Sequence, residues 1–97
     1  QSLGLVQDVV SLANFKNKWE AFGWDTSEID GHNLSEVCEA LEKKSLQGKP
    51  RAIIAHTVKG KGISFMENDL AWHYACICDV EYEKACQELN FAIDKEY

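Results

Sequence analysis

The sequence feature that most constrains the fold is a strand-like segment, a helical segment and a second strand-like segment in close succession. Residues 24–29 predict a short strand that polar residues dilute, and residues 51–58 (RAIIAHTV) form the apolar run typical of a buried strand. Two such strands joined by a helix make a βαβ unit, in which the strands run parallel. We therefore expect an α/β fold with a parallel sheet.

The segment between the two strands carries the signals of a helix. Asp30-Gly31 predicts a turn, and Asn33 followed by Glu36 predicts a capping box. Apolar residues then recur at helical spacing, namely Leu34, Val37, Cys38 and Leu41. Amphipathic spacing predicts two further helices, one over residues 12–22 that ends near Gly23 and one that Asp79 caps. The last helix is expected to carry its apolar residues on one face: Tyr82, Cys86, Leu89 and Ile93.

Length, charge and cysteines narrow the class of protein. The 97 residues suffice for one modest core, so we expect one domain or part of one. The net charge is −6, yet residues 43–66 contain only basic charges, which favours a small anion over nucleic acid as a ligand. Cys76 and Cys78 lack zinc-site spacing, and Cys38 and Cys86 fall on predicted apolar helix faces, so we expect reduced, non-ligating cysteines. No segment has the length of a membrane-spanning helix, and we expect a soluble protein without membrane partners.

Two lysines and two glycines follow the second predicted strand. Lys59-Gly60-Lys61-Gly62 stands where ligands bind in open parallel sheets, outside the carboxyl ends of the strands. Glycine lets backbone N–H groups approach a phosphate closely, and lysine adds positive charge. The pattern is typical of an anion site that His73 would complete, although solvated lysines and a loop histidine held by a polar neighbour also explain it.

Four sequence blocks resemble transketolases. The blocks are KWEAFGW (18–24), IDGHN (29–33), KPRAIIAHTVKGKGISFMEN (49–68) and Trp72-His73. Their order and spacing resemble the end of the thiamine diphosphate-binding half of that family, from about residue 1 to residue 90. The related 1-deoxyxylulose-5-phosphate synthase also has an Asp-Gly-His turn, but Trp-His after Phe-Met-Glu-Asn favours transketolase.

The resemblance implies an activity and a set of site residues. It implies transfer of a two-carbon ketol unit between sugar phosphates with thiamine diphosphate, by a magnesium-dependent, dimeric, cytoplasmic enzyme of the pentose phosphate pathway. It also places Lys59, Gly60, Gly62 and His73 at the cofactor, with His73 as the catalytic candidate. Lys59 would support the diphosphate or the aminopyrimidine side, and His73 would donate a hydrogen bond to the diphosphate or to a substrate oxygen.

The chain also departs from the family pattern. Tyr74 stands where transketolases have glycine, and residues 75–78 (ACIC) replace a polar segment that contains proline. By the same resemblance, the magnesium ligands would precede Gln1, and the glutamate that activates the aminopyrimidine belongs to a separate domain. We therefore expect residues 1–97 to be the C-terminal part of a thiamine diphosphate-binding domain, either a fragment or a small subunit. It would be inactive alone and would work with the rest of a transketolase or with a partner subunit.

A second hypothesis is a non-catalytic remnant or small subunit that binds a partner chain, which fits the change at Tyr74.

The remaining histidines have structural interpretations: His32 anchors the turn before the helix, and His56 satisfies a buried hydrogen bond in its strand. The tryptophans are interpreted as core or interface anchors: Trp19, Trp24 and Trp72.

Overall fold

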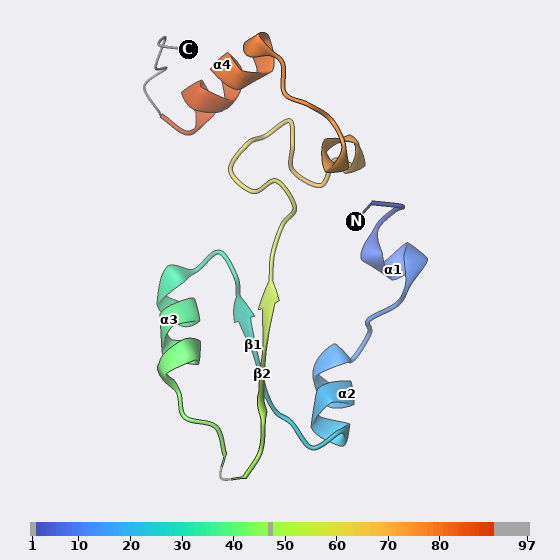
Figure 1. Cartoon of the computed structure of the whole chain (residues 1–97), viewed down its shortest axis with the longest axis vertical. Helices are drawn as coiled ribbons and strands as arrows, with labels where there is room; N and C mark the ends of the chain where they lie inside the picture. Colours follow the sequence, from blue (N-terminus) through green and yellow to red (C-terminus); the bar gives the residue numbers. More distant parts are fainter. Residues whose placement is uncertain (1, 47, 91–97) are drawn as a thin grey trace. The chain divides into compact units, whose positions relative to one another are not determined.

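The computed structural model describes residues 2–46 and 48–90. These fall into two compact units, which we call the sheet unit (residues 6–57) and the loop unit (residues 2–5 and 58–90). The sheet unit contains α1 (Val6–Val9), α2 (Phe15–Ala21), β1 (Asp25–Asp30), α3 (Leu34–Glu42) and β2 (Arg51–His56). The loop unit contains a 3-10 helix, η1 (Leu70–His73), and α4 (Asp79–Glu88), as Figure 1 shows.

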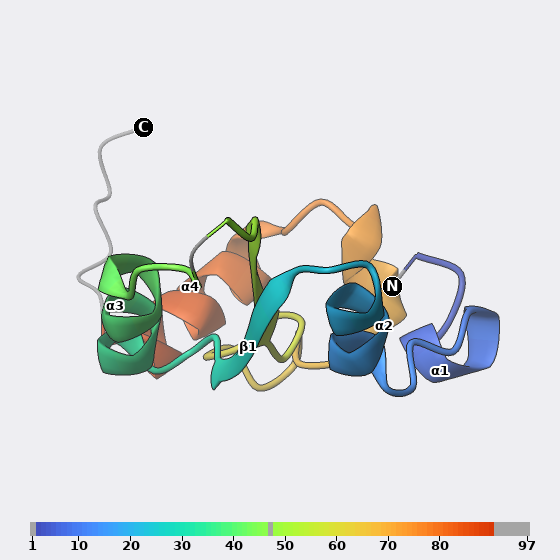
Figure 2. The same ribbon diagram turned by 90° about the horizontal axis from the view of Figure 1, so that it is seen from below.

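The sheet unit is a parallel βαβ unit. β1 and β2 pair in parallel from Asp25 opposite Arg51 to Asp30 opposite His56, and α3 connects them. The pairing continues past the strand ends, since Gly31 N donates to His56 O at 2.8 Å. α2 and α3 both contact β1, and they lie on opposite sides of it in Figure 2. The α/β prediction and the prediction of parallel strands are confirmed.

The start of α3 follows the predicted capping box with one change. The Asn33 side chain accepts hydrogen bonds from Ser35 N at 3.1 Å and from Glu36 N at 3.3 Å. Glu36 does not return to the backbone of Asn33; it accepts from Asp30 N at 2.9 Å and from the side-chain amide of Asn33. The backbone N–H of Asn33 instead donates to Asp30 O, so the cap and the turn before it form one network.

The end of α3 is tied to the strands by side chains. Arg51 donates from Nη2 to Leu41 O at 3.0 Å, which satisfies one of the carbonyl groups that a helix end leaves without a partner. The Asp25 carboxylate accepts from Leu46 N at 2.8 Å in the connection to β2. These two contacts fix where the chain turns from α3 into the second strand.

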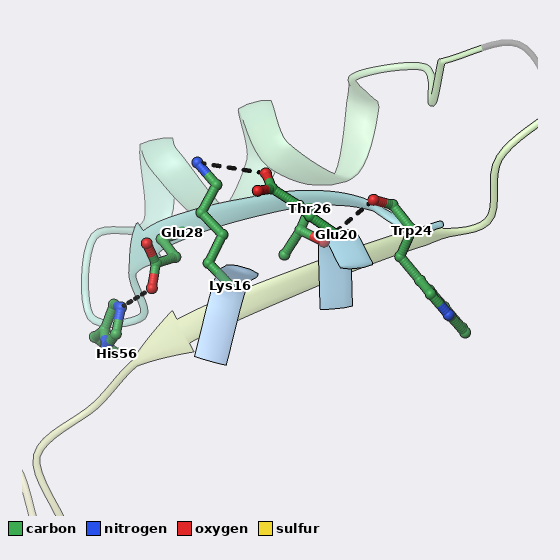
Figure 3. Close-up of polar contacts among 6 residues, drawn as sticks. All are labelled: Lys16, Glu20, Trp24, Thr26, Glu28 and His56. Carbon is green, nitrogen blue, oxygen red and sulfur yellow. Dashed lines mark hydrogen bonds and ion pairs between the residues drawn. The ribbon is translucent and has the colours of Figure 1, made fainter. Parts of the chain in front are cut away.

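Figure 3 shows polar side-chain contacts of the sheet unit. His56 Nε2 and Glu28 Oε1 lie 3.3 Å apart, which confirms a bonded His56, but the imidazole is 66% exposed. The predicted burial of His56 is therefore wrong, because the residue is the last of β2 and faces solvent there. Thr26 is buried and donates from Oγ1 to Trp24 O at 3.5 Å. On α2, Lys16 and Glu20 form an exposed ion pair at 3.9 Å.

The N-terminal helices differ from the prediction. The helix expected over residues 12–22 begins only at Phe15, because Asn14 adopts a left-handed conformation with φ 55° that a helix cannot include. Its end is as predicted: Phe22 is the cap, and Gly23 follows with φ 88°. The short helix α1 was not predicted, since its four residues are too few to show a helical period.

The predicted apolar faces are buried only in part. Within the described residues the buried hydrophobic side chains are Ala40 in the sheet unit and Ala85 and Cys86 in the loop unit. Cys86 is buried as predicted. Cys38 is exposed, because the strand pair is too narrow to cover the whole apolar face of α3, where Leu34 is 78% exposed.

The last helix begins one residue earlier than its predicted cap implies. Cys78 is the N-cap, and Asp79 is the first helical residue. Cys78 N donates to Glu81 Oε2 at 2.9 Å, and this hydrogen bond holds the pKa of Glu81 below its usual value. Ile93, expected on the same helix, lies outside the described residues. None of the described helices combines the length and the apolar character that crossing a membrane requires.

Candidate functional site

The candidate site is built around residues 59–69, which we call the glycine loop. Lys59 closes this loop with both its backbone and its side chain. Lys59 O accepts from Asn68 N at 2.9 Å, and Lys59 Nζ donates to Asp69 O at 2.7 Å. The half-buried Lys59 side chain is therefore a structural element of the loop as well as a positive charge.

The two glycines of the loop have backbone conformations that disfavour a side chain, and at Gly60 the space for one is also taken. Gly60 has φ 72°, and a Cβ added there would meet the Met66 carbonyl, with the carbonyl carbon 2.7 Å away. Gly62 has φ 100°, a conformation that side chains rarely adopt. The backbone can take this closed path because neither position carries a side chain.

A carboxylate already faces the second glycine. Glu67 Oε1 accepts from Gly62 N at 3.1 Å and lies 3.6 Å from Lys61 Nζ. A backbone N–H and an ammonium group are the donors that a phosphate oxygen would use. An anion bound at these two groups would therefore compete with Glu67. The sequence pattern does not indicate this competition, since it does not show which acid folds back onto the loop.

The glycine loop leads directly into η1, which ends at His73. The Asp69 carboxylate caps η1 by accepting from Ala71 N at 2.9 Å. Lys59 thus donates to the residue that caps the 3-10 helix carrying His73, and Asp69 connects the two predicted site residues. His73 is exposed, and its ring packs edge-on against Tyr74 with the centroids 4.7 Å apart. Tyr74 is itself 87% exposed.

Trp72 anchors η1 to the glycine loop. Its indole Nε1 donates to Phe65 O at 3.0 Å, and its ring lies 5.5 Å from the Phe65 ring between centroids. The interpretation of Trp72 as an anchor is confirmed. Trp19 and Trp24 likewise pack edge-on, with centroids 4.8 Å apart, in the sheet unit.

The loop is also attached to α4. Glu88 accepts hydrogen bonds from Ser64 N at 2.5 Å and from Ser64 Oγ at 2.6 Å. These bonds hold the pKa of Glu88 below its usual value, and the hydroxyl has the larger effect. Sequence reasoning missed this pair, because 24 residues separate the partners and Glu88 lies outside the blocks that resemble transketolases.

The donor types of this site suit a diphosphate but not a magnesium ion. Lysine ammonium groups, an accessible imidazole and loop N–H groups are the usual partners of a phosphate anion. Magnesium prefers clustered oxygen ligands, and the described residues hold no group of three or more His, Cys, Asp or Glu side chains that could bind a metal. The described part of the chain therefore does not fit a magnesium site of its own.

A known protein family matches the part of the chain that contains the βαβ unit and the glycine loop. The chain matches the family model described as transketolase, thiamine diphosphate binding domain, over residues 4–97. It therefore belongs to the transketolase family of thiamine diphosphate-binding domains.

Individual relatives are transketolases or transketolase subunits. The chain is 42% identical over 88 residues to the 6-deoxy-6-sulfo-D-fructose transketolase subunit SqwG of a Clostridium species, covering 90% of this chain and 32% of that protein. It is 34% identical over 96 residues to an apulose-4-phosphate transketolase subunit of Phocaeicola vulgatus, covering 98% and 34%. Transketolase of Mus musculus is 46% identical over 59 residues, covering 61% and 9%. The chain thus spans about a third of the length of the first two relatives.

Proposed function

We propose that this chain serves a transketolase-type enzyme that transfers a two-carbon ketol unit between sugar phosphates with thiamine diphosphate as cofactor. The observation that carries the proposal is the family match, which includes the glycine loop and η1 as well as the βαβ unit. Thiamine diphosphate, when bound, supplies the electron sink for making and breaking carbon–carbon bonds next to a carbonyl. The residues of this chain bind and orient.

Lys59 is proposed to hold the loop and to contact the cofactor at the same time. An ammonium group has three N–H donors, and the Asp69 carbonyl takes one of them at 2.7 Å. The others can meet a diphosphate oxygen or the aminopyrimidine side. Gly60 and Gly62 then let the backbone pass close to the diphosphate, and Glu67 has to give up the N–H of Gly62 if that group takes part.

His73 is proposed as the residue that donates a hydrogen bond to the diphosphate or to a substrate oxygen on which negative charge develops. Its exposed ring is held at the end of η1, and the edge-on contact with Tyr74 limits how the imidazole can turn. A donor fixed before the reaction stabilises the developing charge without having to reorganise.

Partners and magnesium complete the proposal. Two relatives are named as subunits, which supports a partner subunit that supplies the rest of the active site. Magnesium would be held by residues outside the described part of this chain, in a dimeric assembly. We propose that the enzyme works in the cytoplasm and in the pentose phosphate pathway. The names of two relatives include other sugars, apulose 4-phosphate and 6-deoxy-6-sulfo-D-fructose.

The test compares two histidine variants in the full-length protein with its partner subunit, using a ketose phosphate donor and an aldose phosphate acceptor. We expect His73→Ala to lower kcat about a hundredfold, the size of a lost proton-donating group. The matched control is His56→Ala, which removes an exposed histidine of the sheet unit and should leave kcat unchanged. Equal kcat values for the wild type and His73→Ala, with cofactor bound, would contradict the role of His73.

A second candidate function is binding without catalysis. Large apolar side chains are exposed on the sheet unit, with Phe22 84% and Leu34 78% exposed, and such surfaces are typical of protein interfaces. A non-catalytic subunit would use them to bind a partner chain and would not depend on thiamine diphosphate.

A further inference from the structure

We propose that Glu88 positions the glycine loop for cofactor binding by holding Ser64, so that α4 supports the loop from outside. The pair of Ser64 and Glu88 is named the loop clamp. The inference rests on the proposed function for the identity of the ligand, thiamine diphosphate, but the contact itself is a property of the loop unit.

The geometry of the loop clamp is that of a two-point attachment. One carboxylate oxygen of Glu88 accepts from the backbone N–H of Ser64 at 2.5 Å, and the other accepts from its hydroxyl at 2.6 Å. Hydrogen bonds to an ionised carboxylate are shorter and stronger than those between neutral groups, and two parallel bonds also fix orientation. Since one of the donors is backbone, the clamp sets the path of the main chain as well as the place of a side chain.

A second contact from the end of α4 reaches the same part of the loop. A Cβ added at Gly62 would lie 3.4 Å from Leu89 Cδ2, so the residue after Glu88 packs against that glycine. The end of α4 therefore meets the loop at positions 62 and 64, on both sides of Ile63. Gly62 is one of the residues proposed to lie at the diphosphate, and the end of α4 packs against the loop at this residue.

The contacts inside the loop do not make the clamp redundant. Lys59 joins the two ends of the loop, and Glu67 joins Gly62 to the later part of it. Each of these contacts has both partners within residues 59–69, so they set the shape of the loop but not its place on α4. The loop clamp sets that place together with the packing of Leu89 on Gly62, and it supplies the hydrogen bonds of this attachment, which makes Glu88 a positioning residue and not a catalytic one.

The experiment uses the full-length protein in complex with its partner subunit. Three variants are compared with the wild type: Glu88→Gln, Ser64→Ala and the double variant. Glu88→Gln is expected to raise the Kd for thiamine diphosphate about tenfold, the effect of losing hydrogen bonds to a charged group. At saturating cofactor, kcat should stay within about twofold of wild type, because the reacting groups are intact. The double variant should be no worse than Glu88→Gln, because the two residues act through one contact.

Two matched variants separate positioning from loss of structure. Glu83→Gln removes an exposed charge of α4 for which the described residues show no bond, and it should leave the Kd unchanged. Ser64→Ala removes the hydroxyl donor and should raise the Kd. Ser64→Thr keeps both donors and should leave the Kd at the wild-type value. An unchanged Kd in Glu88→Gln, or an equal rise in Glu83→Gln, would overturn the proposal.

A measurement without cofactor makes the outcome independent of the proposed function. Amide hydrogen exchange over residues 59–69 should be about tenfold faster in Glu88→Gln than in wild type or Glu83→Gln, since the loop loses its attachment to α4. Unchanged exchange would overturn the loop clamp. If exchange changes as expected but the wild-type assembly does not bind thiamine diphosphate, the proposed function fails and the clamp is kept.

Discussion

At the scale of single residues, Gly60 is the position at which the glycine loop depends most on the absence of a side chain. Gly60→Ala should destabilise the folded protein by about 2–3 kcal/mol, because the added Cβ meets the Met66 carbonyl and the backbone has φ 72°. Urea unfolding of the full-length protein measures this change. Binding of thiamine diphosphate should weaken as well, because the loop has to open to relieve the contact.

The control for Gly60→Ala is Gly23→Ala. Gly23 also has a left-handed backbone, with φ 88°, but nothing lies within 4 Å of an added Cβ. We expect a loss of about 1 kcal/mol there, from backbone strain alone, with no effect on cofactor binding. If the two variants lose the same stability, the contact with Met66 is not what requires glycine at position 60.

The candidate site shows which features of single residues can be predicted from the sequence and which cannot. Lys59, Gly60, Gly62 and His73 could be named from a resemblance, because a motif keeps its residue types and their order. The partners of these residues could not. The contact of Lys59 with Asp69 O depends on how the loop closes, and a backbone acceptor has no signature in the sequence.

At the scale of secondary structure, the cap of α3 connects the first strand of the βαβ unit to its helix. Asn33→Ala should lower the free energy of unfolding by about 1 kcal/mol, because the N–H groups of Ser35 and Glu36 lose their acceptor. Urea unfolding followed by circular dichroism measures the change.

Asn17→Ala provides the control for the cap. Asn17 is exposed inside α2, where alanine has the higher helix propensity, so this variant should keep or slightly raise the stability. A loss in Asn17→Ala equal to that in Asn33→Ala would contradict the capping role, because it would reflect a general cost of replacing asparagine.

The elements differ in how well the sequence predicts them. β1, α3 and β2 could be predicted because strand runs, a cap and a turn all indicate the same order. The start of α2 could not, since the left-handed conformation of Asn14 is set by the chain around it and not by the apolar spacing. Periodicity identified the apolar face of α3, but it does not say what covers that face.

At the scale of the whole molecule, the exposed apolar surface of the sheet unit leads to a prediction about assembly. A shallow apolar pocket of about 390 Å³ is lined by Phe15, Lys18, Trp19 and Phe22, and Leu34 is exposed on α3. Exposed surfaces of this kind mark contacts with other protein parts. We expect native mass spectrometry of the full-length protein to show it bound to a partner subunit.

The same spectra distinguish the two candidate functions. With thiamine diphosphate and magnesium added, an enzyme subunit should give a complex heavier by the mass of the cofactor and the metal. A complex that forms but takes up neither would favour the non-catalytic subunit. A protein that stays alone or pairs with itself, indifferent to the cofactor, would contradict the proposed partner.

The way the glycine loop closes has a consequence for how such proteins evolve. Lys59, Glu67 and Asp69 shape the loop from within, so the stretch can be inherited or exchanged between relatives as one block. Glu88 lies outside that block and holds Ser64 inside it. A recombination event that brings in a loop without a hydroxyl at this place would leave the acid on α4 with the backbone N–H as its remaining donor of the pair.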